Sequence, residues 1–173
     1  MKVPMQKITI VLLLALFFAP LLVQAETPTR QPLFHIARSK NANIVQYDAQ
    51  VDADGKLFRK APVVAYWIRL AEEGQVQKLS WIQKTFAYGF DAKLNGSREE
   101  AELDMKADVK REVTVVRVGD KYRATIRIDD APSYFDKMYI DATLNGWSLS
   151  VHYVELYGED IKTGEARYEK FVP

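Results

Sequence analysis

Strict alternation along residues 101–110 constrains the fold of this 173-residue chain more than any other feature of its sequence. Ten consecutive positions switch without a break between apolar and charged side chains. On a β-strand this period places every apolar side chain on one face, whereas on a helix the same side chains would scatter around the axis. The Glu-, Ala- and Lys-rich composition favours a helix, but the alternation predicts a strand.

Similar period-two segments recur along the chain and are separated by turn signals, of which Asn95-Gly96 and Asn145-Gly146 are typical hairpin pairs. Regular short strands of this kind indicate a mainly β fold. We therefore predict an antiparallel meander barrel or sandwich of about eight or nine strands with one short helix. The predicted strands cover residues 33–38, 44–51, 63–70, 101–110, 112–118, 121–128, 138–144, 148–157 and 166–172.

The one predicted helix covers residues 79–88. Leu79, Ile82 and Phe86 are spaced to form a short apolar stripe, and Gly89 suits the left-handed position that often ends a helix. A single helix this short is marginal alone, so we expect the stripe to pack on the sheet or to plug one end of a barrel.

The first 25 residues have the pattern of a secretory signal peptide. Lys2 and Lys7 precede an apolar run, and Val23-Gln24-Ala25 offers small residues for cleavage after Ala25. An uncleaved membrane anchor is the alternative, but the run is short for a spanning helix of about 20 residues. We expect a periplasmic or secreted protein with no membrane span after cleavage, a flexible leader at 26–32 and a single β domain at 33–173.

The rest of the composition excludes several classes of protein. The chain has no cysteine, so neither a lipid anchor on cysteine nor a disulfide is available. Its formal net charge is +1 and it has no basic stripe, so we do not expect nucleic-acid binding. Asp52-Ala53-Asp54-Gly55 hints at a calcium loop, but Ala61 stands where a bidentate Glu is needed. A turn with φ > 0 at Gly55 is the favoured interpretation.

Three segments resemble a known family. They are FHIARSKNANIVQY at 34–47, PVVAYWI at 62–68 and AYGF at 87–90. Together they resemble bacterial exported proteins grouped as domain of unknown function 4833. The resemblance covers nearly all of the chain after the first thirty residues, and it implies no catalytic residues because that family is uncharacterised.

Catalytic and metal sites have only weak support in the sequence. His35, Ser39 and Asp48 could form a triad, but the G-x-S-x-G elbow of α/β-hydrolases is absent. His35, His152 and Glu155 could meet across the sheet, yet neither histidine lies in a metal-binding spacing. We therefore expect no cofactor, no metal and no catalytic residues, and a hydrolase is a distant third hypothesis.

Polar and aromatic residues around the first hairpin form the candidate site. Arg38 presents a planar donor fork that suits a carboxylate or phosphate. Tyr66 and Trp67 are adjacent on a strand, so one faces inward and the other outward. The full set of candidate ligand-binding residues is His35, Arg38, Asn43, Tyr47, Tyr66, Trp67, Tyr88 and His152.

Two functions fit these features. The leading hypothesis is a periplasmic, non-enzymatic module whose barrel-like interior binds a small amphipathic or polar-headed ligand. The alternative is a structural or partner-binding envelope domain with a solid core. Interior volume distinguishes the two hypotheses, because a ligand needs an open cavity.

Cleavage after Ala25 is directly testable. The intact mass of the mature protein, purified from cells that export it, should equal the mass of residues 26–173 because the signal peptidase removes the apolar run. A mature protein that retains residues 1–25 would show instead that the run is an uncleaved anchor.

Overall fold

The computed structural model describes residues 27–38, 41–106, 111–145 and 148–173. The predicted signal peptide lies outside these ranges. Within them the chain forms strands, one α-helix and one 3-10 turn. In order they are β1 (Thr29–Arg38), β2 (Asn41–Val51), β3 (Val63–Arg69), η1 (Leu70–Glu72), β4 (Gln75–Lys78), α1 (Trp81–Phe86), β5 (Phe90–Leu94), β6 (Glu100–Met105), β7 (Val113–Val118), β8 (Lys121–Ile128), β9 (Ala131–Asn145), β10 (Ser148–Asp160) and β11 (Ala166–Phe171).

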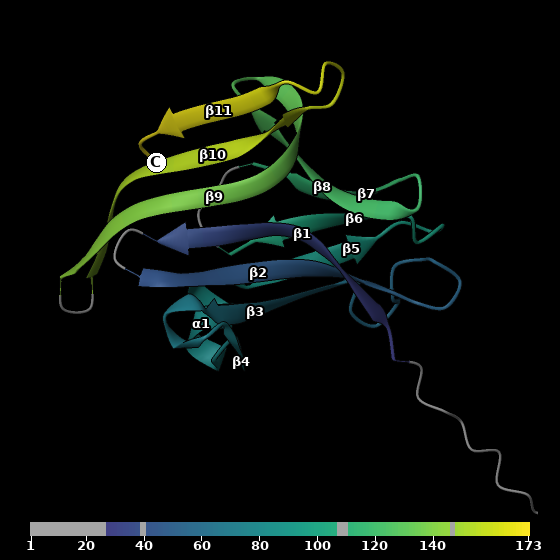
Figure 1. Ribbon diagram of the computed structural model, residues 1–173, viewed down its shortest axis with the longest axis horizontal. Coiled ribbons are helices and arrows are strands. Elements are labelled where there is room, and N and C mark those ends of the chain that lie inside the picture. Colours follow the sequence, from purple (N-terminus) through teal and green to yellow (C-terminus); the bar gives the residue numbers. More distant parts are fainter. Residues whose placement is uncertain (1–26, 39–40, 107–110, 146–147) are drawn as a thin grey trace, which may run out of the picture.

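All strands belong to one sheet that curls into a half-barrel (Figure 1). The order is β4-β3-β2-β1-β9-β8-β7-β6-β5, and β10 and β11 extend the sheet from the other edge of β9. In Figure 1, β1 and β2 pass in front of β5 and β6, so that the β1–β3 and β5–β8 groups of strands form facing walls. The prediction of a mainly β fold with one short helix is confirmed.

The pairing of β1 with β9 departs from the predicted antiparallel meander. These strands run parallel, from His35 opposite Lys137 to Arg38 opposite Ile140. The first part of β9, residues 131–134, pairs with β8 instead. One long strand therefore joins both walls, and this long-range contact could not be read from local periodicity.

The space between the walls is packed with side chains of the chain itself. Phe34 stacks on Tyr47 with ring centroids 4.4 Å apart, and it also contacts Phe135 at 4.6 Å. The predicted strand at 101–110 is confirmed for β6, whose burial alternates at every residue. Strands β7 and β8 of the same wall contribute further buried residues, which include Val113, Val115, Ala124, Ile126 and Ile128.

Several boundaries differ from the predicted ones. Strand β1 begins at Thr29, so the end of the segment predicted to be a flexible leader is already in the sheet. Strands β4 and β5 were not predicted, since four and five residues are too few to show a clear period. Strand β9 starts at Ala131 because Asp129 and Asp130 both have positive φ and form a two-residue turn.

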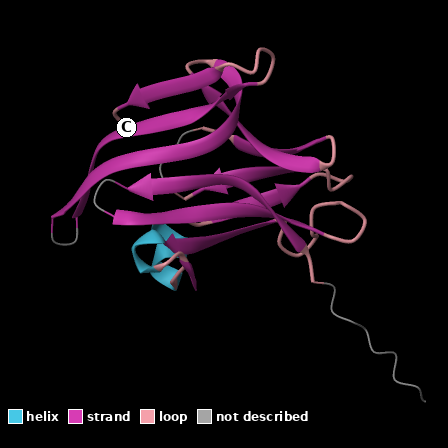
Figure 2. Ribbon diagram, viewed as in Figure 1, coloured by secondary structure: helices cyan, strands magenta, loops and turns pink. Residues whose placement is uncertain are grey.

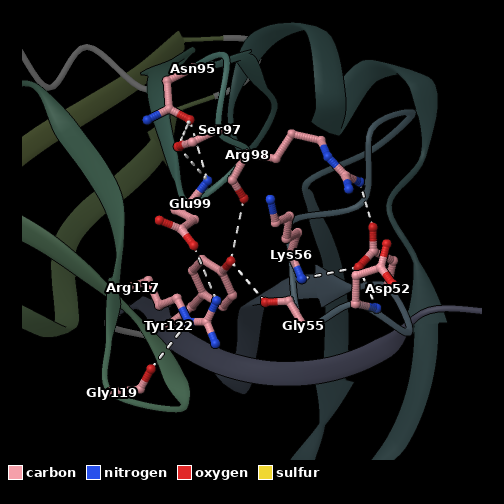
Figure 3. A network of polar contacts seen from close by, with 11 residues as sticks. Asp52, Gly55, Lys56, Asn95, Ser97, Arg98, Glu99, Arg117, Gly119 and Tyr122 are labelled. Atoms are coloured by element: carbon pink, nitrogen blue, oxygen red, sulfur yellow. Dashed lines mark hydrogen bonds and ion pairs between the residues drawn. The ribbon is translucent and has the colours of Figure 1, made fainter.

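A polar network, which we call the clamp, joins the two walls on the side away from α1 (Figures 1 and 3). Asp52 forms an ion pair with Arg98, and their side chains are only 6% and 18% exposed. Asp52 Oδ1 also accepts hydrogen bonds from the backbone N–H groups of Asp54 and Lys56, both at 3.0 Å. Gly55 has φ +72°, so the predicted turn at 52–55 is confirmed.

The third component of the clamp is Tyr122 of β8. Its hydroxyl lies 3.2 Å from the carbonyl oxygen of Gly55 and 3.3 Å from that of Arg98. The Leu57 N–H donates to the same Arg98 carbonyl at 2.9 Å. Burial opposes the charge on Asp52, but hydrogen bonds from Lys56 and Arg98 outweigh it and lower the pKa of the carboxyl. The loop after β2 is thereby tied to the β5–β8 wall.

Removing the cation of the clamp should destabilise the fold. We expect Arg98→Met to lower the free energy of unfolding by about 3 kcal/mol, because Asp52 stays buried without its partner. Lys93→Met is the matched control, since it breaks an exposed pair with Glu102 and should cost less than about 1 kcal/mol. Urea denaturation measures both values.

The same comparison has a defined pH dependence. The pKa of Asp52 is lowered in the folded state, so its stabilising contribution is complete above the ordinary carboxyl pKa and is lost as the pH falls through the folded value. The difference between wild type and Arg98→Met should therefore shrink in acid. Equal losses for Arg98→Met and Lys93→Met at neutral pH would contradict a special role for the clamp.

Candidate ligand-binding cleft

Helix α1, cyan in Figure 2, connects β4 and β5, the two ends of the main strand path. Its N-terminus has a capping box. The Gln83 N–H donates to Ser80 Oγ at 3.3 Å, and the Ser80 N–H donates to Gln83 Oε1 at 2.8 Å. Two otherwise unpaired donors are thereby satisfied, which stabilises a helix of only six residues.

The predicted inward-facing apolar stripe of this helix is wrong. Ile82 and Phe86 are exposed, and α1 itself contains no buried residue. The buried anchors are instead Leu79 and Tyr88, which lie just outside the two ends of the helix. The chain is therefore anchored just before and just after α1, and no side chain of α1 itself is buried in the core.

Gly89 is required for a different reason from the one predicted. It is not among the described glycines with positive φ. A Cβ at this position would lie 1.7 Å from the carbonyl oxygen of Lys84. The absence of a side chain lets β5 start directly against the last turn of α1.

An open cleft of about 440 Å³ lies between β3, α1 and the start of β5. The cleft is thus at the open side of the half-barrel, not in the packed centre of the sheet. Its apolar lining residues are Val63, Val64, Ala65, Leu79, Tyr88 and Phe90. Its polar lining residues are Lys84, Thr85, Asp91 and Lys106.

The two lysines of the cleft differ electrostatically. Lys106 forms an ion pair with Asp91, and this hydrogen bond raises the pKa of the ammonium. Among the residues that the structure describes, no carboxylate lies within ion-pair distance of the Lys84 ammonium. The positive charge of Lys84 is therefore the one available to an incoming anionic group.

Tyr88, itself a predicted site residue, lines the cleft and contacts three others. Arg38 Nη1 donates to the Tyr88 hydroxyl at 3.2 Å. The Tyr47 hydroxyl donates to the Tyr88 carbonyl oxygen at 2.8 Å. Trp67 packs edge-on against the Tyr88 ring, with centroids 5.2 Å apart. Of these four residues, Tyr88 lines the cleft and the other three hold it in place.

Tyr47 and Trp67 belong to the inner face of the sheet. Tyr47 is fully buried, and burial together with neighbouring Tyr88 raises the pKa of its phenol. The Tyr47 hydroxyl therefore has a structural role, since it holds the Tyr88 backbone. Asn43 and Trp67 line a second, smaller cleft of about 310 Å³ that also includes Gln83 of α1. The two clefts thus flank the same helix.

His35, Tyr66 and His152 lie elsewhere. Tyr66 is on the outer face of β3, as predicted for one of the Tyr66–Trp67 pair, and its hydroxyl donates to Asp48 Oδ2 at 2.5 Å. Burial and this contact with Asp48 raise the pKa of Tyr66 to about 12. His152 is exposed and hydrogen-bonds Thr143. A ligand role for these three residues stays a prediction.

The structure also bears on the two chemical sites considered from the sequence, the catalytic triad and the metal site. Burial and Lys137 lower the pKa of His35, so its imidazole is neutral at neutral pH. Ser39, the third member of the hypothetical triad, lies outside the described residues. Glu155 accepts hydrogen bonds from Tyr157 and Tyr168. In the part of the chain that the structure describes, no cluster of three His, Cys, Asp or Glu could hold a metal ion.

Sequence reasoning missed the polar residues of the cleft. Lys84, Asp91 and Lys106 come from segments that only the curl of the sheet brings against β3. No motif marks them, and β5 itself was not predicted. The local signals for this region were the predicted helix at 79–88, Tyr88 as a candidate site residue and the AYGF segment at 87–90.

The fold and the cleft define a class of protein, a curved single-sheet β domain with one helix across its open side. The chain belongs to the family described as Domain of unknown function (DUF4833), whose model matches residues 34–170. No curated protein and no solved structure matches the chain. The matched range extends from β1 into β11 and therefore includes α1 and the whole cleft.

The close contact at Gly89 gives a test of how α1 is held. Gly89→Ala should lower the free energy of unfolding by about 3 kcal/mol, because the new methyl group collides with a backbone carbonyl that cannot easily move. Gly96→Ala is the matched control, since nothing lies within 4 Å of its added Cβ. Thermal unfolding of both variants measures the difference, and equal midpoints would contradict the tight contact.

Proposed function

We propose that this chain is an exported, non-enzymatic binding domain that takes a small amphipathic molecule in the cleft between β3, α1 and β5. The cleft is the observation that carries the proposal. Its volume of about 440 Å³ is within the range of small-molecule sites, which are mostly apolar with a few convergent polar groups. Export to the periplasm is supported by the charged start, the apolar run and the small residues before position 26.

The charges at the cleft favour an anionic head group. The Lys84 ammonium lacks a carboxylate partner among the described residues, whereas Lys106 already pairs with Asp91. A ligand carboxylate beside Lys84 would gain a charge-assisted hydrogen bond. The apolar floor, which includes Val63, Ala65 and Phe90, suits an alkyl or aromatic tail. Medium-chain carboxylates are therefore the ligand class that we propose.

The packed interior favours the second candidate function, a structural or partner-binding envelope domain. Buried side chains from both walls fill the space in which the sequence alone suggested a ligand. The two proposals thus differ in what they assign to the cleft at the open side. In the first it holds a small molecule, and in the second it is only a surface groove.

Calorimetric titration with decanoate tests the first proposal. Decanoate should bind with 1:1 stoichiometry, and decyltrimethylammonium, which has the opposite charge, should not. Lys84→Glu should weaken decanoate binding by at least about tenfold, because it replaces an attractive charge by a repulsive one. Lys121→Glu, a charge reversal at the exposed start of β8, is the matched control and should leave binding unchanged.

Two outcomes would overturn this proposal. Decanoate binding that Lys84→Glu leaves unchanged would move the site away from the cleft. If decanoate does not bind, and native mass spectrometry of protein from its own envelope gives only the polypeptide mass, the partner-binding alternative is favoured.

A further inference from the structure

Helix α1 exposes its largest apolar side chains. Trp81, Ile82 and Phe86 are 73%, 64% and 69% exposed. At 3.6 residues per turn these three positions fall within an arc of about 140° on one side of the helix. The Trp81 and Phe86 rings contact each other edge-on at 6.1 Å. We call this set of three side chains the α1 apolar face.

The fold does not require the α1 apolar face. Leu79, Tyr88 and the close contact at Gly89 already hold the helix against the sheet. Contiguous exposed apolar side chains on a folded domain mark a surface that binds something. No helix among the described residues has the length and apolarity to cross a bilayer.

The charges near the α1 apolar face favour a negatively charged binding partner. Between Gly74 and Phe90 the only charged residues are Lys78 and Lys84, and both are exposed. Tryptophan and phenylalanine are well suited to the boundary between head groups and acyl chains. Flanking lysines add attraction to anionic lipids.

The size of the α1 apolar face argues against a stable protein interface. An aromatic side chain offers about 150–250 Å², so one isoleucine and two partly exposed aromatics fall short of the roughly 800 Å² per partner that such an interface buries. Binding to a bilayer surface instead scales with the apolar area that inserts plus the electrostatic attraction to anionic lipids, so a small apolar face beside lysines can contribute.

We propose that α1 docks the protein on an anionic lipid surface. Trp81, Ile82 and Phe86 enter the boundary between head groups and acyl chains, and Lys78 and Lys84 face the head groups. This docking does not require that the cleft binds a carboxylate, but the two proposals share Lys84.

Flotation with lipid vesicles tests the proposal. The full-length mature protein should float with phosphatidylglycerol–phosphatidylcholine vesicles and less with phosphatidylcholine alone. The triple variant Trp81→Ser, Ile82→Ser, Phe86→Ser should lose at least about tenfold in partitioning, because it removes the apolar area that enters the lipid. The matched control Val118→Ser, Ile161→Ser, Val172→Ser removes three exposed apolar side chains elsewhere and should float like wild type.

Fluorescence gives an independent measurement. Brominated lipids should quench the emission of wild type, and Trp81→Phe should remove most of that quenching while it keeps flotation, since Phe is also apolar. Two results would overturn the proposal: wild type that does not float with anionic vesicles, or a triple variant that floats equally well. A dimer that the triple variant abolishes would also overturn it, because the α1 apolar face would then be a protein interface.

Failure of this proposal is distinguishable from failure of the proposed function. The triple serine variant leaves Lys84 and the floor of the cleft unchanged. It should therefore bind decanoate in calorimetry as wild type does, whichever way the flotation experiment comes out.

Discussion

The parallel pairing of β1 with β9 is the contact on which the rest of the architecture depends. Without it the chain would form separate antiparallel meanders, since every other pairing of β1–β4 and β5–β8 is between strands adjacent in the sequence. Because β9 is long enough to pair with β8 first and β1 further along, the two walls face each other and share one core. At the two ends of the main strand path, β4 pairs only with β3 and β5 only with β6. On the side away from α1 the walls are tied by Asp52, Arg98 and Tyr122.

The two sides of the half-barrel are therefore built differently. Toward the clamp, buried polar groups are matched with each other and leave little for a ligand. At the open side, the rings of Tyr88 and Trp67 form a T-shaped contact, and the backbone and hydroxyl of Tyr88 are held by Tyr47 and Arg38. One face of this fixed residue belongs to the core and another lines the cleft. A fixed wall next to Lys84 would keep the entropy cost low for the carboxylate ligand that we propose.

The sequence predicted what depends on neighbours along the chain. The alternation at 101–105 described β6 correctly, and the adjacency of Tyr66 and Trp67 predicted their opposite faces. It could not predict the β1–β9 pairing, because a strand has the same period in parallel and antiparallel sheets. It also could not place Lys84 and Lys106 on one cleft, since only the curvature of the sheet brings their segments together. The apolar stripe of the helix failed because spacing reveals a shared face but not which way that face points.

The wrongly predicted orientation of the helix shows that the residues that stabilise α1 differ from those that it exposes. A six-residue helix has too little intrinsic stability to persist alone, so it exists here because Leu79, Tyr88 and the capping box of Ser80 fix the chain on both sides of it. These anchors would hold α1 equally well if Trp81, Ile82 and Phe86 were polar. Leaving three large apolar side chains in water gives the folded monomer no packing energy in return. Their exposure is the observation on which the proposed docking surface rests, and exposed Lys78 and Lys84 would add attraction to anionic lipid.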